Sequence, residues 1–217
     1  MNRLGDILAS SPQLSSLRMK ATATAEGDDS VQPLGPSRWN WKDIKRVLLI
    51  RLRSIGDTVL STPSVTALKR FVPEADIDIL VEDWVAPVLA GHPDVHRVRT
   101  IEGNSLSARA RVAREIRTAR YDVVYNLHGG TTATFLTRAT GARHRVGYAT
   151  YQYAQLHNHL APPSSELWSQ TKTHSVEQQL ALLGWTGVPV TDRPPTSLAV
   201  TQTAAAAIDQ RIKAAGL

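Results

Sequence analysis

The chain has 217 residues, of which 42% are hydrophobic and 20% charged, values typical of an ordinary globular protein. It contains no cysteine, which excludes disulfides, thiolate zinc sites and cysteine nucleophiles. The formal net charge is +6, and the whole excess lies in residues 41–217, because residues 1–40 hold equal numbers of basic and acidic side chains. A basic folded part favours anionic partners, such as phosphorylated glycolipid, nucleic acid or acidic membrane surface.

Residues 1–40 are rich in Ser, Ala, Thr, Gly and Pro and poor in large apolar side chains. Such a segment cannot offset its ordering entropy, so we expect a disordered amino-terminal tail over 1–40. The sequence has no apolar run of membrane-spanning length and no compact apolar core of a signal peptide. We therefore expect a soluble, cytoplasmic protein.

The ordered part opens with a short, continuous apolar run at 47–50 that is rich in β-branched residues, typical of a strand buried on both faces of a sheet. A turn over 51–57 leads into a helical segment through Phe71, which Pro63 divides or kinks. The pattern then repeats, with strands expected at 77–81, 97–101, 122–127 and 145–148, and helices at 84–90, 105–119 and 131–140. This alternation predicts βαβ units and an open parallel sheet, an α/β Rossmann-like fold.

The carboxyl-terminal third is less regular. Residues 149–173 are aromatic and rich in His, a helix is expected over 174–183, and 187–200 is typical of a linker or short edge strand. A last helix is expected over 202–215. We therefore assign one Rossmann-like domain to 41–200 and a terminal helix to 201–217.

Ligands in open parallel sheets bind outside the carboxyl ends of the strands, so the loops at 53–57, 82–84, 102–104 and 128–130 should share one rim. Asp57 lies on this rim at the start of a helix. The position alone leaves two interpretations open, a carboxylate stabilised by the helix dipole and a functional group. The three-glycine dinucleotide pattern is absent, and Gly129-Gly130 is either an anion cradle or a plain turn.

Four segments together resemble glycosyltransferase family 9, the heptosyltransferase family, over about residues 45–217. The opening segment, 47–63, contains Arg51-Leu52-Arg53-Ser54-Ile55-Gly56-Asp57 and ends in Thr62-Pro63. The others are Tyr121-Asp122 with the strand up to Gly129, Gly141-Ala142-Arg143-His144-Arg145-Val146-Gly147-Tyr148, and His174-Ser175-Val176-Glu177 with Leu180, Leu182 and Leu183. The opening segment is the most specific of the four.

The resemblance implies inverting transfer of a heptose from an ADP-sugar to the inner core of lipopolysaccharide, on a two-domain GT-B fold with the acceptor on the amino-terminal domain. It implies that Asp57 is the general base, which must reach the acceptor hydroxyl directly. It implies no metal and no cofactor, with ADP-heptose as donor substrate. The expected partners are the lipopolysaccharide core acceptor, the nucleotide sugar and the inner-membrane surface.

The candidate substrate contacts are all near these segments. Arginine forks suit the carboxylates and phosphates of the acceptor, although each of these arginines could equally lie on a solvated strand end. Arginines at 109–120 are scattered around a helix and are expected on a solvated face. The candidate substrate-binding residues are Arg51, Arg53, Ser54, Gly56, Thr58, Arg143 and Arg145.

A complete family member carries a second Rossmann-like domain for the ADP-sugar, and that domain is expected to begin about where this chain stops. We therefore expect this chain alone to transfer sugar poorly. The alternative is a Rossmann-like module that binds an anionic glycolipid or nucleotide without catalysis. We do not expect nucleic-acid binding, because the basic residues lack interleaved aromatic side chains on a strand.

Overall fold

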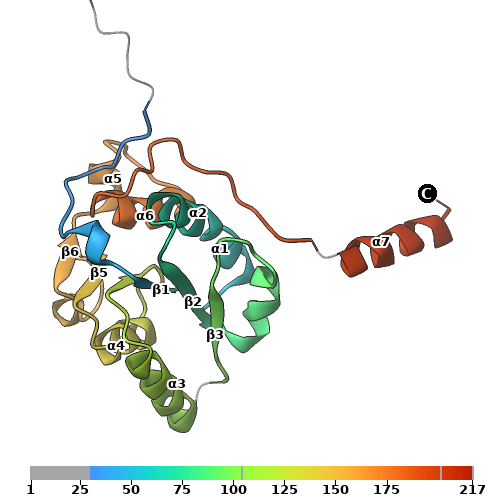
Figure 1. Cartoon of the computed structure of the whole chain (residues 1–217), viewed down its shortest axis with the longest axis horizontal. Coiled ribbons are helices and arrows are strands. Elements are labelled where there is room, and N and C mark those ends of the chain that lie inside the picture. The colour runs from blue at the N-terminus through green and yellow to red at the C-terminus, as the bar shows by residue number, and fades with distance from the viewer. Residues whose placement is uncertain (1–29, 104, 201, 217) are drawn as a thin grey trace, which may run out of the picture. The chain divides into compact units, whose positions relative to one another are not determined.

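The computed structural model describes residues 30–103, 105–200 and 202–216. The part that begins at Val31 contains a six-stranded parallel sheet in the order β3-β2-β1-β4-β5-β6. The strands are β1 (Arg46–Ile50), β2 (Asp76–Glu82), β3 (Arg97–Ile101), β4 (Val123–Asn126), β5 (His144–Tyr148) and β6 (His159–Ala161). The expected open parallel α/β sheet is confirmed (Figure 1).

Helices connect successive strands, as the alternation predicts. The α-helices are α1 (Ile55–Val59), α2 (Thr62–Phe71), α3 (Leu106–Thr118), α4 (Thr131–Ala139), α5 (Ser164–Leu167), α6 (Ser175–Gly184) and α7 (Gln202–Ala214). Short 3-10 helices are η1 (Trp41–Asp43), η2 (Asp83–Leu89) and η3 (Ala154–Leu156). Pro63 does divide its segment, lying in the first turn of α2 just after α1 ends. None of these helices is both long enough and apolar enough to cross a bilayer.

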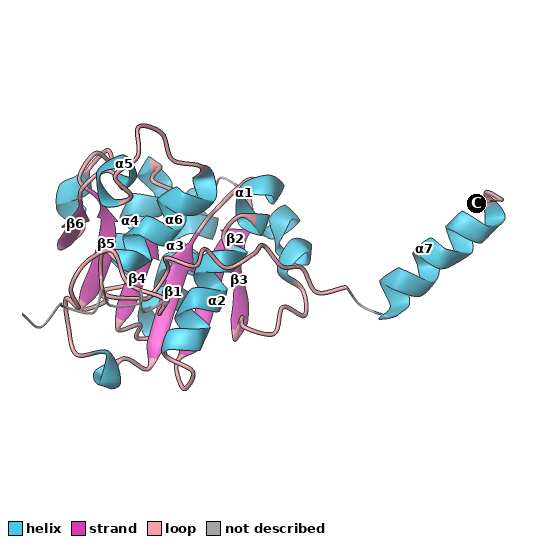
Figure 2. Cartoon of the chain, turned by 90° about the horizontal axis from the view of Figure 1, so that it is seen from above, coloured by secondary structure: helices cyan, strands magenta, loops and turns pink. Residues whose placement is uncertain are grey.

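The sheet is buried on both faces, which explains the continuous apolar run of β1. Val47 and Leu49 pack on the face covered by α2 and α6, whereas Leu48 and Ile50 pack on the face covered by α3 and α4 (Figure 2). All four side chains are fully buried. Alternate strand residues point to opposite faces, so β1 stabilises both hydrophobic layers at once.

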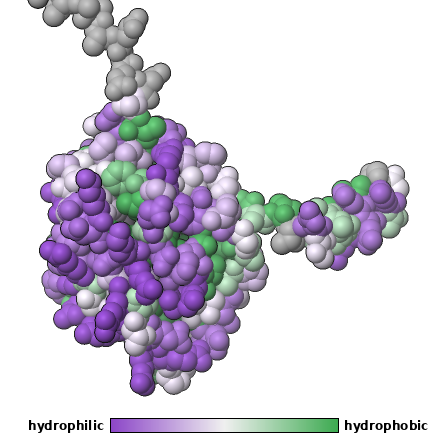
Figure 3. Space-filling model, viewed as in Figure 1, coloured by the Kyte–Doolittle hydropathy of each residue, from purple (hydrophilic) through white to green (hydrophobic). Residues whose placement is uncertain are grey.

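The solvated face expected for the arginines of α3 is confirmed for three of the four, whereas Arg109 is half-buried. Arg111, Arg114 and Arg117 are exposed, and hydrophilic side chains dominate this surface in Figure 3. The buried stripe of α3 consists of Ala108, Val112 and Ile116. Leu106, the first residue of the helix, is 82% exposed.

The structure corrects the boundary of the expected tail. Residues 1–29 lie outside the described part of the chain, but residues 31–40 are packed against the domain. The Leu34 amide donates to Gly184 O at 3.0 Å, and Trp39 stacks on His144 with ring centroids 4.4 Å apart. These two large side chains bury enough apolar surface to order a segment whose average composition suggested a tail.

A second difference concerns residues 149–173, which were expected to be irregular. They contain the short strand β6, which pairs in parallel with β5 through Val146 and His159. Three residues are too few to show a period-2 pattern, so the strand was not visible in the sequence.

Candidate active site

The strand order reverses between β1 and β4, which makes the carboxyl ends of these two strands the topological switch point of the sheet. Residues 51–54 leave β1 here, and residues 127–130 leave β4. Asp57 lies in the first turn of α1, directly after this turn. The expected rim position of Asp57 is therefore where the structure places it.

Three side chains donate hydrogen bonds to the Asp57 carboxylate. Arg51 Nη2 lies 2.6 Å from Oδ2, and Ser54 Oγ lies 3.2 Å from the same oxygen. Ser175 Oγ lies 3.2 Å from Oδ1. Burial alone would raise the pKa of Asp57, but the charge and hydrogen bond of Arg51 and the hydrogen bonds of Ser175 and Ser54 hold that pKa below its usual value. Asp57 is therefore ionised near neutral pH.

Arg51 is engaged within the protein. Its side chain is only 12% exposed, and its Nη1 donates to Leu127 O at 2.9 Å. Both terminal nitrogens thus have partners, one on the Asp57 carboxylate and one at the end of β4. Arg51 was expected to bind substrate, but here it holds Asp57 and ties the ends of β1 and β4 together.

Arg53 lies on the same rim but contacts other side chains than Arg51 does. Its Nε lies 3.2 Å from Glu82 Oε1, and its side chain is 54% exposed. The other oxygen of Glu82 accepts a hydrogen bond from Trp84 Nε1 at 2.8 Å. Glu82 therefore fixes a guanidinium and an exposed indole side by side, next to α1, which packs against η2.

Asn126, the last residue of β4, stabilises the loop that follows this strand. Its Oδ1 accepts hydrogen bonds from the His128 amide at 3.2 Å and the Gly129 amide at 2.9 Å. The Gly129 amide is therefore engaged within the protein, which favours the plain-turn interpretation at this residue. Gly129 has φ +77°, and a Cβ there would lie 2.6 Å from the Tyr151 ring.

His128 lies on this rim near Arg51 and Arg53. Burial first, and then the charges of Arg51 and Arg53, lower the pKa of His128 against the opposing influence of Glu82 and Asp57. Its Nδ1 is buried and has no partner among the described residues. The imidazole is therefore neutral near pH 7.

Three expected contacts are not brought to the site. Val47 pairs with Val123 and Val123 with His144, so Arg143 lies at the edge where the strands begin, opposite Asp57. Arg145 Nη1 donates to Ala142 O at 2.7 Å, at the same edge. The family-like segment that contains these two arginines forms β5. The register of the sheet places both of them near the start of this strand, away from the rim.

Thr58 is the third misplaced residue, because it is fully buried beneath Asp57. The side chains of adjacent helix residues point in different directions, so the Thr58 side chain points into the core while the Asp57 carboxylate lies on the rim. Ser54 and Gly56 do lie exposed at the turn, and a Cβ on Gly56 would meet no atom within 4 Å.

Sequence reasoning missed Ser175, Glu82 and Trp84 as members of the site. Glu82 ends β2 and Trp84 lies in η2, within the segment 82–84 that was expected on the rim, so their position was predictable and their contacts were not. Ser175 comes from a helix 118 residues after Asp57, and no local pattern links the two. Only the packing of α6 brings them together.

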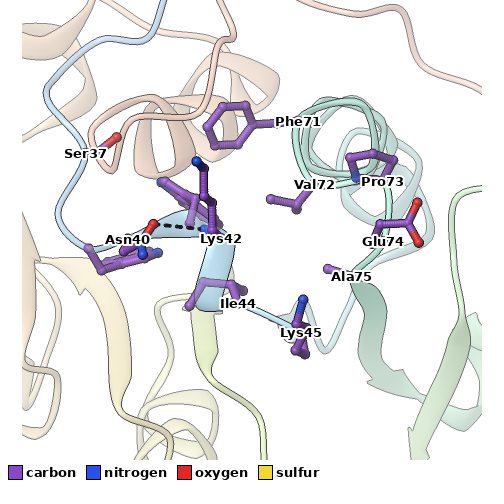
Figure 4. Close-up of a pocket in the computed structure, with 12 residues that line it drawn as sticks. Ser37, Asn40, Lys42, Ile44, Lys45, Phe71, Val72, Pro73, Glu74 and Ala75 are labelled. Atoms are coloured by element: carbon purple, nitrogen blue, oxygen red, sulfur yellow. Dashed lines mark hydrogen bonds between the residues drawn. The ribbon is translucent and has the colours of Figure 1, made fainter.

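A pocket of about 650 Å³ lies elsewhere, between η1 and the end of α2 (Figure 4). It is lined by Ile44, Phe71 and Ala75. Ile44 lies just before β1 and Ala75 just before β2, so the pocket is at the edge of the sheet where the strands begin. The length of β1 separates it from Asp57 by roughly 17 Å at about 3.3 Å per residue. Over the described ranges, His, Asp and Glu side chains form no group of three that could hold a metal ion.

Comparisons with known proteins agree with this architecture. Residues 109–213 match the model of glycosyltransferase family 9 (heptosyltransferase), a match that begins after Asp57. The chain is 27% identical over 134 residues to lipopolysaccharide heptosyltransferase 3 of Escherichia coli, covering 59% of this chain and 36% of that protein. It is 29% identical over 107 residues to lipooligosaccharide heptosyltransferase 2 of Haemophilus ducreyi, covering 48% of this chain and 30% of that protein.

Two solved structures share the fold. A glycosyl transferase family 9 protein from Veillonella parvula superposes with a TM-score of 0.70 at 20% identity, over 80% of this chain and 50% of that one. The E. coli ADP-heptose lps heptosyltransferase II superposes with a TM-score of 0.62 at 22% identity, over 77% of this chain and 50% of that one. The chain thus spans less than half the length of the two curated relatives and half of each solved structure. The chain is a homologue of the heptosyltransferases of glycosyltransferase family 9.

Proposed function

We propose that the protein transfers a heptose from ADP-heptose to the inner core of lipopolysaccharide with inversion, and that this domain holds the acceptor. The observation that carries the proposal is the ionised carboxylate of Asp57 at the switch point of the sheet, held by Arg51 and Ser175 and still 35% exposed. Relatives named as lipopolysaccharide heptosyltransferases support the substrate class.

Asp57 would act as the general base. The acceptor O–H bond breaks as its proton passes to the carboxylate, and the oxygen forms a bond to the anomeric carbon of the donor. The bond between that carbon and the ADP oxygen breaks at the same time, and its electron pair leaves on the diphosphate. Its lowered pKa keeps Asp57 ionised at neutral pH, the state in which a carboxylate can accept a proton.

The rim beside Asp57 would bind the acceptor. Among the described residues, Arg53 makes one ion pair, between its Nε and Glu82. Its terminal nitrogens make no ion pair, so they can contact an anionic sugar or phosphate. Neutral His128, which is half-buried on this rim, can exchange a hydrogen bond with a sugar hydroxyl. Ser54 and Gly56 leave room for the acceptor at the turn itself.

We propose that the protein works in the cytoplasm, at the membrane surface that presents the lipid-linked acceptor. The excess of basic side chains in residues 41–217 supports attraction to an anionic lipid surface. ADP-heptose and the lipopolysaccharide core are the proposed partners.

A transfer assay tests the proposal directly. The purified protein is incubated with ADP-heptose and with core acceptor isolated from cells that lack heptose, and the product is measured by mass spectrometry. We expect slow addition of one heptose residue to the acceptor, clearly above a control without protein. Binding of the acceptor without any transfer would support the non-catalytic module instead and contradict the proposed function.

A further inference from the structure

The amino-terminal end of α6 approaches Asp57 through Ser175, the first residue of that helix. Ser175 is not needed to cap its own helix, because His174 and Glu177 form a capping box around the helix start. The Ser175 hydroxyl is therefore free for another acceptor, and it donates to Asp57 Oδ1.

A second residue of α6 reinforces the approach. Gln179 lies one turn after Ser175 on the same side of the helix and is 3% exposed. Its Nε2 lies 3.5 Å from the backbone oxygen of Asp57. Because α6 contacts both the side chain and the backbone of Asp57, the helix fixes where the carboxylate lies and not only how it is charged.

The two carboxylate oxygens of Asp57 have different surroundings. Oδ2 accepts from Arg51 and from Ser54, whereas Oδ1 accepts from Ser175 alone among the described residues. A carboxylate oxygen can accept about two hydrogen bonds. Oδ2 is therefore filled, and Oδ1 retains one free acceptor position on a side chain that is 35% exposed.

We propose that Ser175 is a positioning residue that directs Asp57 Oδ1 at the hydroxyl of the acceptor and so selects the oxygen that takes the proton. This inference rests on the proposed function. In the step, the substrate O–H bond breaks and an Oδ1–H bond forms, while the freed electron pair of the substrate oxygen attacks the anomeric carbon. The amide dipoles at the start of α6 assist Ser175 in stabilising the ionised form.

A titration that requires no turnover tests the contact. The carboxyl pKa of Asp57 is measured by NMR in the wild type, in Ser175→Ala and in Ser165→Ala, with the Asp57 resonance assigned from Asp57→Asn. Ser165 is a half-buried serine on α5 without a side-chain partner in the described structure and serves as the matched control. Loss of a donor to the charged form should raise the pKa of Asp57 in Ser175→Ala only. An unchanged pKa in Ser175→Ala would overturn the proposal.

Kinetics separate positioning from mere packing. Ser175→Thr and Ser175→Val have the same shape and differ only in the hydroxyl, so the pair remains informative if Ser175→Ala does not fold. We expect the Thr variant to retain the wild-type kcat within about 3-fold and the Val variant to lose about 10-fold or more, the worth of one hydrogen bond to a charged group. The KM for ADP-heptose should not change, and the acid limb of the rate profile should move to higher pH in the Val variant.

The outcomes distinguish the positioning role of Ser175 from the proposed function of the protein. Equal kcat values and equal pH profiles for the Thr and Val variants would show that the hydroxyl only packs, and would overturn the positioning role. Absence of transfer by the wild type would instead contradict the proposed function, and with it the catalytic purpose of Ser175. The NMR titration would still report the Ser175–Asp57 contact in that case.

Discussion

Arg51 Nη2 lies 2.6 Å from Asp57 Oδ2 while Nη1 of the same guanidinium donates to Leu127 O at 2.9 Å. One side chain therefore connects the end of β1, the start of α1 and the end of β4. These are the elements that form the switch point of the sheet. The position of Asp57 depends on this bridge as much as on its own helix.

Replacing Arg51 with Ala should destabilise the fold and raise the pKa of Asp57. Breaking a fully buried ion pair costs about 3–5 kcal/mol. Asp57 is 35% exposed, so solvent screening reduces the expected loss to roughly 1–2 kcal/mol. Urea unfolding gives the free energy, and the matched change is Arg53→Ala, whose exposed pair with Glu82 should be worth about 0–1 kcal/mol. Equal losses in the two variants would contradict the bridging role of Arg51.

Gly129→Ala should disturb the loop beside the site. The residue has φ +77°, and the added Cβ would lie 2.6 Å from the Tyr151 ring. Backbone strain and overpacking together should cost about 2–3 kcal/mol. Gly103→Ala is the control, because its φ is +62° but no atom lies within 4 Å of the added Cβ, so only strain of about 1 kcal/mol applies. Thermal unfolding of both variants measures the difference, and a smaller loss for Gly129→Ala would disprove the steric account.

Thr58→Val separates a buried position from a substrate contact. Thr58 is fully buried, and its Oγ1 has no partner within the described part of the chain. Removing a buried hydroxyl that makes no hydrogen bond should be neutral or stabilising. Thr186→Val should destabilise by about 1 kcal/mol or more, because Thr186 Oγ1 bonds both Leu183 O and Tyr125 Oη. A large loss of acceptor affinity in Thr58→Val would restore the contact expected from its place in the sequence.

The sheet and the rim were predictable because their signals are local. A run such as 47–50 and the turn before Asp57 carry their information within a few residues. The partners of Asp57 were less accessible, since Arg51 was expected to face a ligand and Ser175 was not considered. Arg145 lies away from the rim because the family-like segment at 141–148 runs along β5. Arg145 is near the start of that strand, whereas the rim is formed where the strands end. Contacts between distant segments depend on packing, which the sequence pattern does not encode locally.

Stability should fall in mild acid because of His144. Its ring stacks on Trp39, and its Nδ1 lies 3.0 Å from His159 Nε2. Burial, followed by the charges of His159 and Arg143, lowers the pKa of His144 to about 4. An unfolded His titrates near about 6.5, so between these values the unfolded chain binds a proton that the folded chain does not.

The contribution of His144 is therefore complete above about pH 6.5 and declines until about pH 4. Thermal unfolding at pH 7 and pH 5 should show a lower midpoint at pH 5. The drop should be smaller in His144→Gln, which has no titrating ring. An identical drop in the variant would assign the pH dependence to other groups.

The general-base role of Asp57 is tested by comparing the kcat/KM of Asp57→Asn with that of the wild type, using ADP-heptose and a heptose-deficient core acceptor. Asn keeps the shape of the side chain but cannot take a proton, so circular dichroism should be unchanged. We expect a loss of about 10²–10⁴-fold in kcat/KM with acceptor binding retained. A variant that transfers heptose at the wild-type rate would contradict the assignment of Asp57 as the base.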